Sequence, residues 1–362
     1  MYPLPPSLEA GDALTTLAVL LAADINENRF HCSIHRMQRR FETYASTCPE
    51  PVISPGLVVT PEVRIQSELY LPIAEIAAVF NRLYSAALAY PPIFSSTPFH
   101  NAMSWADTFV ELPPYLQFSA NPALMLERLL TDRELLIEFL FASFLPRRFY
   151  GGSGRYPEQQ KFIREWLKTV DTETLHCLDA ACGTGEETYG LALLLSEAGL
   201  EPGGIRIDGW TLEPLEVWAA AHRSFPHDRH REALLREATT TLFRRGYGRC
   251  ISFGCRDILT TPSQSGLHSK YSGRGSSENG QFDLILCNGL LGGPIIHEKE
   301  PLDRAVGNLA LLLSPGGILL AADHFHGGWK QKCPQGKLRA LFETHGLLYV
   351  DTGEGIGGLK PD

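Results

Sequence analysis

One stretch decides the fold of this chain: Cys-Leu-Asp-Ala-Ala-Cys-Gly-Thr-Gly-Glu-Glu, residues 177–187. It begins in an apolar segment typical of a strand, passes through a loop with Gly183 and Gly185, and enters a segment typical of a helix. Glycine lets the backbone approach a ligand closely, and the N-terminus of a helix offers amide donors. Ligands of doubly wound sheets bind at the carboxyl ends of the strands. We therefore expect a ligand site at this loop.

The residues after the two glycines exclude one class of ligand. A dinucleotide-binding fold has a Gly-x-Gly-x-x-Gly pattern, and the helix that follows it holds a pyrophosphate. Here the third glycine is absent, and the carboxylates of Glu186 and Glu187 would repel a pyrophosphate. Two carboxylates suit instead a ligand that carries a cationic amino group and a sulfonium.

The sequence from Leu175 onward alternates short apolar segments with segments of helical periodicity, which indicates an α/β fold with a parallel sheet. The predicted strands are Leu175–Ala180, Ile205–Thr211, Ile251–Gly254, Phe282–Cys287, Gly317–Ala322 and Leu347–Val350. The predicted helices are Glu187–Ala198, Leu215–Arg223, Arg231–Arg244, Leu302–Leu313 and Gly336–His345. We expect one domain over residues 151–362.

Residues 1–150 are expected to form a separate and mostly helical domain. Apolar residues recur at helical spacing in four segments: Leu14–Ala23, Ile73–Ala89, Pro122–Leu130 and Asp132–Phe144. Leu57–Ile65 has β-branched residues around Thr60-Pro61, and we interpret it as a candidate strand. No chemical motif stands out in this half of the chain.

The composition limits the classes of partner that this chain can bind. A length of 362 residues suggests two domains, and a net charge of −9 without a long basic run argues against binding a nucleic-acid backbone. No stretch of about 18 apolar residues and no leader-like N-terminus is present, so we expect no membrane segment and a cytoplasmic location. The eight cysteines form no Cys-x-x-Cys pair, which predicts reduced, buried thiols and no metal site.

The segment Asp-Ala-Ala-Cys-Gly-Thr-Gly-Glu-Glu-Thr-Tyr-Gly, residues 179–190, resembles the first motif of the CheR family of chemotaxis receptor glutamate methyltransferases. That family usually has Pro and Ser where Thr188 and Gly190 stand here. The wider class is the class I methyltransferase fold, a Rossmann-like sheet of seven strands, six of which are placed above. The resemblance extends from about Arg155 to the C-terminus, and it implies S-adenosylmethionine as the cofactor.

Further segments resemble cofactor-binding parts of the class. Phe282–Asn288 is similar to the fourth-strand motif, which ends in an Asn at the methionyl side of the cofactor. Cys255–Leu259 is similar to the segment after strand three, where a polar residue and an apolar neighbour hold the adenine. The resemblance implies these cofactor-binding residues: Arg155, Asp179, Ala181, Gly183, Gly185, Glu187, Asp257, Ile258 and Asn288.

Two departures from the family concern the end of the second predicted strand. The family has an acidic residue there that takes both ribose hydroxyls, but the matching position is Thr211 and the nearest carboxylate is Glu213. Either Glu213 moves in or the ribose is held differently, and we favour Glu213. Receptor-tethered members also have a small β-subdomain after this strand, whereas Pro214–Arg249 has room for two helices and shows no β alternation. The first half of the chain lacks the compact basic helical domain that engages receptors.

Methyl transfer is an in-line displacement, so the protein mainly aligns the nucleophile and excludes water. A carboxylate nucleophile needs no base, whereas a base can assist a hydroxyl or an amine. The candidate catalytic residues are His324, His326 and Tyr156, with Asp323 and His297 at the same edge of the predicted sheet. The alternative interpretation is that His324 and His326 are ordinary loop histidines.

Three functions remain open at this point. The first is methylation of an O or N nucleophile of a small molecule, with residues 1–150 as a substrate lid or as the interface of a homodimer. The second is methylation of a protein carboxylate, as in CheR. The third is a non-catalytic cofactor-binding sensor or scaffold.

Overall fold

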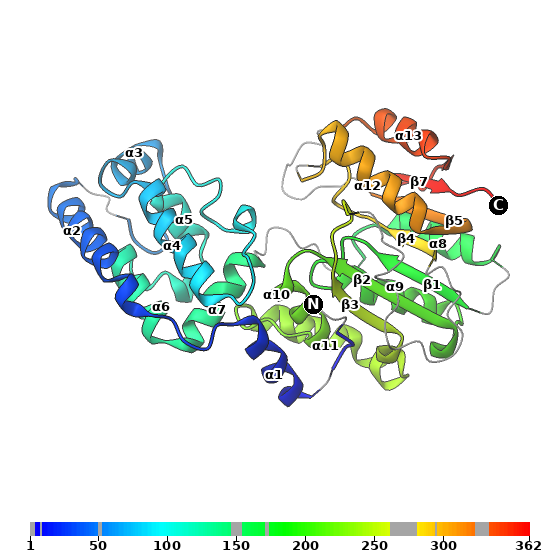
Figure 1. Ribbon diagram of the computed structural model, residues 1–362, viewed down its shortest axis with the longest axis horizontal. Coiled ribbons are helices and arrows are strands. Elements are labelled where there is room, and N and C mark those ends of the chain that lie inside the picture. The colour runs from blue at the N-terminus through cyan, green and yellow to red at the C-terminus, as the bar shows by residue number, and fades with distance from the viewer. Residues whose placement is uncertain are drawn as a thin grey trace. The chain divides into compact units, whose positions relative to one another are not determined.

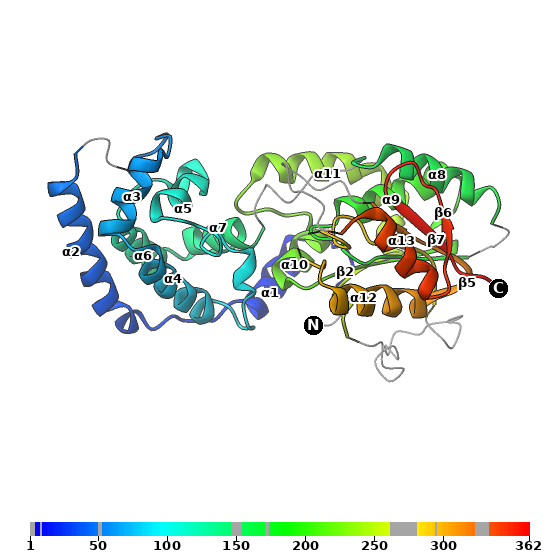
Figure 2. The same cartoon turned by 90° about the horizontal axis from the view of Figure 1, so that it is seen from above.

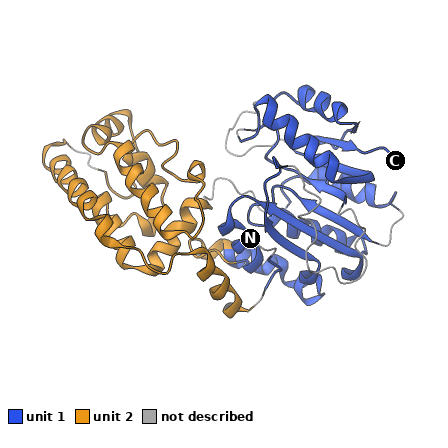
Figure 3. Ribbon diagram, viewed as in Figure 1, with its two compact units in different colours: residues 1–8, 148–223, 232–362 blue, residues 9–147, 224–231 orange. Residues whose placement is uncertain are grey.

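The computed structural model describes residues 4–7, 9–49, 53–145, 154–170, 174–260, 281–293, 295–322 and 333–362. The chain divides into two compact units, shown in different colours in Figure 3. Unit 1 contains residues 1–8, 148–223 and 232–362, and unit 2 contains residues 9–147 and 224–231. Among the described residues, no helix combines the length and the apolar character that crossing a membrane requires.

Unit 2 is built from helices around an aromatic core. Phe80 stacks on Phe99 with ring centroids 4.8 Å apart, Tyr84 stacks on Phe139 at 5.6 Å, and Trp105 is fully buried beside them. Such large rings contribute most of the apolar area that a small helical unit buries. The helices are α1 (Ala10–Leu20), α2 (His31–Thr47), α3 (Pro61–Tyr70), α4 (Ile73–Ala87), α5 (Trp105–Glu111), α6 (Pro122–Thr131) and α7 (Arg133–Phe144).

The four helices predicted in this half of the chain are confirmed, but the strand predicted at Leu57–Ile65 is wrong, because α3 begins at Pro61. The hydroxyl of Thr60 accepts a hydrogen bond from the Val63 amide at 3.3 Å and so caps the helix. Proline favours the first helical position, where its missing amide hydrogen has no partner to lose. Capping at Thr60-Pro61 therefore outweighs the β-branched character of the segment.

Unit 1 contains a sheet of seven strands in the order β3-β2-β1-β4-β5-β7-β6. Strands β1 to β5 pair in parallel, and β7 runs antiparallel to both of its neighbours (Figure 1). This confirms the Rossmann-like seven-stranded sheet predicted from the class I resemblance. The strands are β1 (Leu175–Asp179), β2 (Ile205–Thr211), β3 (Ile251–Cys255), β4 (Phe282–Leu286), β5 (Leu313–Ala321), β6 (Leu348–Val350) and β7 (Ile356–Leu359).

The chain leaves β1 toward β2 and β3 and then returns to the other side of β1 with β4. Ligands bind at such a reversal of strand order, at the carboxyl ends of the strands. Helices cover both faces of the sheet, with α8 and α9 on one face and α12 and α13 on the other (Figure 2). The helices of this unit are α8 (Pro157–Leu167), α9 (Glu186–Glu197), α10 (Pro214–His222), α11 (Arg229–Arg244), α12 (Lys299–Leu312) and α13 (Gln335–Thr344), although the first residues of α11 belong to unit 2.

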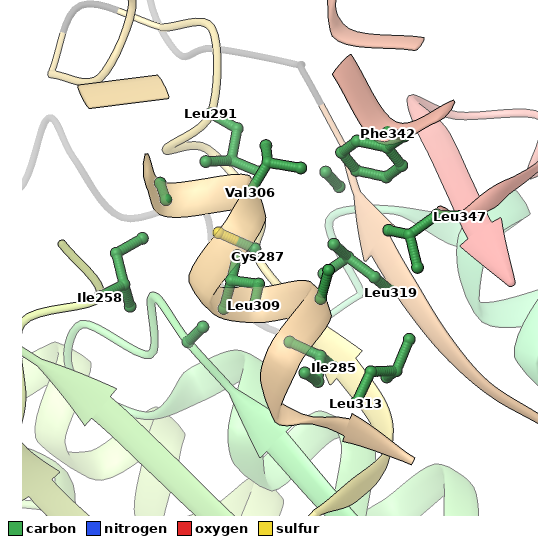
Figure 4. Packing of buried hydrophobic residues seen from close by; sticks show 14 of the residues in the cluster. Ile258, Ile285, Cys287, Leu291, Val306, Leu309, Leu313, Leu319, Phe342 and Leu347 are labelled. Atoms are coloured by element: carbon green, nitrogen blue, oxygen red, sulfur yellow. The ribbon is translucent and has the colours of Figure 1, made fainter. Parts of the chain in front are cut away.

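A buried apolar cluster fixes β4, the strand that leads to Asn288. Val306 and Leu309 of α12 lie in this cluster with Ile285 of β4 and Leu319 of β5 (Figure 4). All four side chains are fully buried. Truncating one such side chain to alanine costs about 2–5 kcal/mol, so the carboxyl end of β4 has a rigid base.

Candidate functional site

The loop between β1 and α9 has a backbone that only glycine adopts easily. Gly183 has φ +49° and Gly185 has φ +87°, both in the left-handed region. A Cβ atom added to Gly185 would lie 3.0 Å from the Cβ of Ala220 and 3.0 Å from the Phe253 ring. The loop is therefore shaped by glycine twice over, through its dihedral angles and through the space beside it.

The end of β2 supports this loop from the side. The Cys182 amide donates to the Trp210 carbonyl at 3.0 Å, which joins the loop to the strand. A Cβ atom on Gly209 would lie 2.7 Å from the Phe253 ring, so this fully buried ring of β3 packs against both Gly209 and Gly185. The glycine loop thus lies on a rigid layer formed by β2 and β3.

Two carboxylates lie at the start of the loop and of α9. Asp179 is fully buried and accepts hydrogen bonds from the Thr188 hydroxyl at 2.7 Å and from the Ala181 amide at 3.4 Å. Burial raises the pKa of Asp179 to about 7, and the charge of Glu187 adds to the rise. Burial also raises the pKa of Glu187, while a hydrogen bond from Asn288 and the charge of Arg155 oppose the rise. A cationic group that binds here would relieve the cost of charging both acids.

Asn288 follows β4 and connects this acidic pair to α8. Its amide group donates to Glu187 Oε2 at 3.0 Å and to Gln159 Oε1 at 2.8 Å. Its Oδ1 accepts from Gln159 Nε2 at 3.0 Å and from the Ala322 amide at 2.8 Å. Every polar atom of this buried side chain therefore has a partner, and its orientation is fixed.

Gln159 and Glu354 were missed by the sequence analysis. Gln159 is buried and forms both hydrogen bonds with Asn288, although it is 129 residues away in the chain. Glu354, between β6 and β7, accepts from the Glu158 amide at 2.8 Å and from the Gln159 amide at 3.3 Å, and so caps α8. The next residue, Gly355, has φ +79°, and a Cβ atom on it would collide with the Ala321 carbonyl oxygen. The turn that carries Glu354 therefore lies directly against the end of β5.

A small cavity brings several of the predicted site residues together. Its volume is about 30 Å³, and its lining includes Arg155, Tyr156, Gln159, Glu187 and Asn288. The Arg155 guanidinium lies over the Tyr156 ring, 4.9 Å from its centroid. A cation, an anion and amide groups thus converge beside the carboxyl ends of β1 and β4, as an amino-acid zwitterion requires.

The two residues considered for the ribose, Thr211 and Glu213, have different hydrogen-bond partners at the end of β2. Thr211 donates its hydroxyl to Glu216 Oε2, a partner that the sequence analysis did not consider. Glu213 is buried and caps α10, because its Oε1 accepts from the Leu215 amide at 3.2 Å. Whether Thr211 or Glu213 holds a ribose stays a prediction.

The two residues predicted for the adenine follow β3. Asp257 Oδ1 accepts from the Leu259 amide at 2.8 Å and holds a turn. Ile258 is buried, and its carbonyl accepts from Asn308 of α12 at 2.8 Å. The segment is therefore held in place on both sides of its apolar side chain.

Of the predicted catalytic residues, Tyr156 is buried at the cavity. His324, His326 and Asp323 lie outside the described residues, so their role stays a prediction. His297 pairs with Glu298 through Nε2 at 3.1 Å.

We expect the stability of Asp179→Asn to rise relative to that of the wild type as the pH rises. Because the pKa of Asp179 is raised from 3.8 to about 7, the folded protein holds a proton that the unfolded chain releases. The free energy of unfolding of the wild type therefore falls between about pH 4 and 7, by at most about 1.4 kcal/mol per pH unit, whereas Asn carries no such proton. Thermal unfolding from pH 5 to pH 8 tests this. A constant difference between the two proteins would contradict it.

No family model matches the chain. The chain is similar to the Probable biofilm formation methyltransferase WspC of Pseudomonas putida. The two are 27% identical over 203 residues, which cover 54% of this chain and 44% of that protein. The chain thus spans less than half the length of this curated relative.

Several solved structures are also similar, all with low TM-scores. The N-methyltransferase NodS from Bradyrhizobium japonicum WM9, in complex with S-adenosyl-L-homocysteine, has a TM-score of 0.34 at 17% identity and covers 64% of this chain and 99% of its own. The amino pentose methyltransferase CalS10 from Micromonospora echinaspora has a TM-score of 0.35 at 13% identity, covering 57% and 91%. The [4+2]-cyclase SpnF has a TM-score of 0.35 at 18% identity, covering 66% and 74%. The strand order β3-β2-β1-β4-β5-β7-β6 is what defines the fold of unit 1.

Proposed function

We propose that the chain is an S-adenosylmethionine-dependent methyltransferase. The observation that carries the proposal is the convergence of Glu187, Asn288 and Arg155 at one cavity, with the left-handed glycine loop leading directly into the helix that carries Glu187. The residues fit this cofactor by charge and by shape. Acidic groups suit its ammonium and sulfonium, and a guanidinium suits its carboxylate. The left-handed glycines carry no side chain, so the loop backbone can approach the ligand closely.

In this proposal each residue has a defined task. Arg155 pairs with the carboxylate of the methionyl part, and Glu187, oriented by Asn288, accepts from its ammonium. Asp257 and Ile258 hold the adenine. The bound cofactor supplies a methyl group that the sulfonium has already activated.

The remaining task of the protein is to align the acceptor and to exclude water. Tyr156 lines the cavity next to Arg155, where its hydroxyl could orient an acceptor. His324 and His326 stay our candidates for a general base, because histidine titrates near neutral pH.

The acceptor that we favour is an O or N nucleophile of a small molecule. The connection from β2 to β3 supports this, because it contains helices and no strand, as the sequence predicted. It therefore offers no β-subdomain for docking a receptor tail. Unit 2 would then act as a substrate lid or as the interface of a homodimer.

Methylation of a protein carboxylate is the second candidate. The resemblance of residues 179–190 to CheR favours it. A labelled-methyl assay on a cell lysate, split into protein and small-molecule fractions, separates the two candidates. A non-catalytic sensor would bind the cofactor and label neither fraction.

The proposed function is tested by calorimetric titration of the full chain with S-adenosylmethionine and S-adenosylhomocysteine. We expect the wild type to bind both, and Glu187→Gln to bind about 10-fold more weakly or worse, because it loses a charged acceptor. Glu197→Gln is the matched control, since Glu197 lies on the same helix but is exposed and pairs with Arg164. A wild type that binds neither ligand would overturn the proposal.

A further inference from the structure

Gln159 forms a reciprocal pair of hydrogen bonds with Asn288, and this pair is buried. Its Nε2 donates to Asn288 Oδ1 at 3.0 Å, and its Oε1 accepts from Asn288 Nδ2 at 2.8 Å. Only 2% of Gln159 is exposed, so rotation of either amide group would leave buried polar atoms without partners. Such atoms are costly, because water cannot replace the lost partner. The two side chains are therefore expected to move as one unit.

The backbone at the end of β5 determines which way both amide groups point. The Ala322 amide can only donate, and it donates to Asn288 Oδ1 at 2.8 Å. The Nδ2 of Asn288 must then lie on the other side, where it donates to Glu187 Oε2 at 3.0 Å. Gln159 can satisfy Asn288 in this orientation only with its own Nε2 toward Oδ1. A flip of either amide group would place donor against donor and acceptor against acceptor.

The turn between β6 and β7 holds Gln159 in place at the start of α8. Glu354 accepts from the amides of Glu158 and Gln159, and the second of these bonds joins residues 195 positions apart. The Thr352 hydroxyl donates to the Glu354 carbonyl at 2.8 Å and closes the turn. A Cβ atom on Gly353 would lie 3.0 Å from the Cβ of Glu158, so the turn and the helix are in direct contact. The position of Gln159 therefore depends on this turn.

We infer that Gln159 is a positioning residue for the cofactor: it holds Asn288 in the one orientation that donates to Glu187, and so fixes the carboxylate that takes the ammonium of the ligand. This inference rests on the proposed function, because it presumes a ligand ammonium at Glu187. Gln159 lines the same cavity but acts through Asn288. Without Gln159, Asn288 loses the two hydrogen bonds that hold its amide plane, and Glu187 loses a rigid partner.

The first test removes the hydrogen bonds and leaves the charge unchanged. Gln159→Met has nearly the volume of the wild type, and calorimetric titration with S-adenosylhomocysteine should show an affinity about 10-fold lower, because two buried hydrogen bonds are lost. Gln117→Met is the matched control. Gln117 is a buried glutamine of unit 2 whose Nε2 donates to the Leu112 carbonyl at 2.7 Å. This control should lose stability and keep the affinity of the wild type.

The second test uses pH to separate positioning from loss of packing. In Gln159→Glu, an ionised carboxylate would place an oxygen against Asn288 Oδ1, which the Ala322 amide prevents from turning away. A protonated carboxyl would donate to Oδ1 as the native Nε2 does, and burial favours this form. The affinity of the variant relative to the wild type should therefore be lowest at about pH 9 and recover as the pH falls to about 5. Gln117→Glu should show no such change.

Other charged groups at this site also respond to pH. Burial raises the pKa of Asp179 at the end of β1 and of Glu187 on α9, and the charge of Arg155 acts on Glu187. The wild type is therefore titrated at each pH, and the ratio of the two affinities is the quantity that tests the inference.

Each outcome bears on a different claim. A wild type that does not bind S-adenosylhomocysteine overturns the proposed function itself. If the wild type binds, the positioning role alone is overturned by wild-type affinity in Gln159→Met, or by an affinity ratio of Gln159→Glu that stays constant with pH. If the variants at position 159 do not fold, Glu354→Ala loosens Gln159 from outside the cavity and should weaken binding, whereas Glu354→Gln keeps an accepting oxygen and should restore it. Equal binding by these two variants would also overturn the positioning role.

Discussion

Replacing Gly185 with alanine will destabilise the protein by about 2–5 kcal/mol and abolish tight binding of S-adenosylhomocysteine. The left-handed φ of +87° costs a residue with a Cβ atom about 1–2 kcal/mol. The new methyl group would also lie 3.0 Å from the Phe253 ring and from Ala220, and overpacking a core costs about 1–3 kcal/mol. Because Phe253 is fully buried, relief must come from the loop itself, which moves the predicted cofactor-binding backbone.

Gly199→Ala is the matched control for this prediction. Gly199 follows α9 with φ +89°, nearly the same backbone conformation, but a Cβ atom there would meet nothing within 4 Å. It should cost about 1–2 kcal/mol from backbone strain alone and leave ligand binding unchanged. Urea unfolding and calorimetric titration of both variants measure the two effects. Equal stability losses, or intact binding by Gly185→Ala, would show that the loop yields to the added methyl group.

Six strands of the sheet could be predicted from the sequence, because buried parallel strands form short apolar runs between helical segments. The strand that escaped prediction, β7, has the sequence Ile-Gly-Gly-Leu and no β-branched run. Its glycines are needed for packing, since a Cβ atom on Gly358 would lie 2.7 Å from the Phe342 ring. Close approach of this kind depends on tertiary contacts that a local pattern does not contain. The prediction of a strand at Leu57–Ile65 was wrong for the opposite reason, because local helix capping at Thr60-Pro61 outweighed the β propensity of the segment.

The candidate site also contains residues that local patterns mark and residues that depend on tertiary contacts. Gly185 and Glu187 belong to one contiguous motif and Asn288 ends another, so each could be named as a candidate because the spacing within a motif is a property of the chain. Gln159 and Glu354 act through partners more than 100 residues away, so no local pattern marks them. The hydrogen bond between Thr211 and Glu216 depends on the path from β2 into α10, which no local pattern contains. The raised pKa of Asp179 likewise depends on burial and not on the motif.

Replacing Asn288 with aspartate is expected to have an effect of similar size. The substitution keeps the shape of the side chain but turns the donor toward Glu187 and Gln159 into a negatively charged acceptor. An uncompensated charge buried beside another carboxylate destabilises a protein by about 3–5 kcal/mol. We expect a loss of that size at pH 8, together with loss of S-adenosylhomocysteine binding, because Glu187 is no longer held in place.

The stability of Asn288→Asp is also expected to depend on pH in a defined direction. Burial and the charge of Glu187 would raise the pKa of the new aspartate, so the folded variant binds a proton that the unfolded chain releases. Its free energy of unfolding should therefore rise toward that of the wild type as the pH falls from 8 to 5. Thermal unfolding across this range measures the effect, and a gap that stays constant would contradict it.

Two further variants separate repulsion from the general cost of burying an acid. Asn308→Asp places an aspartate at another buried position of the same unit, where the native amide donates to the Ile258 carbonyl at 2.8 Å. It should lose stability, and because it also disturbs Ile258, a residue proposed to hold the adenine, only its stability is compared with that of Asn288→Asp. Adding Glu187→Gln to Asn288→Asp removes one of the two facing charges and supplies a new donor, so the double variant should be more stable than Asn288→Asp alone. A double variant that is less stable would mean that the carboxylate of Glu187 does not face position 288 in solution, and the network that orients it would have to be redrawn.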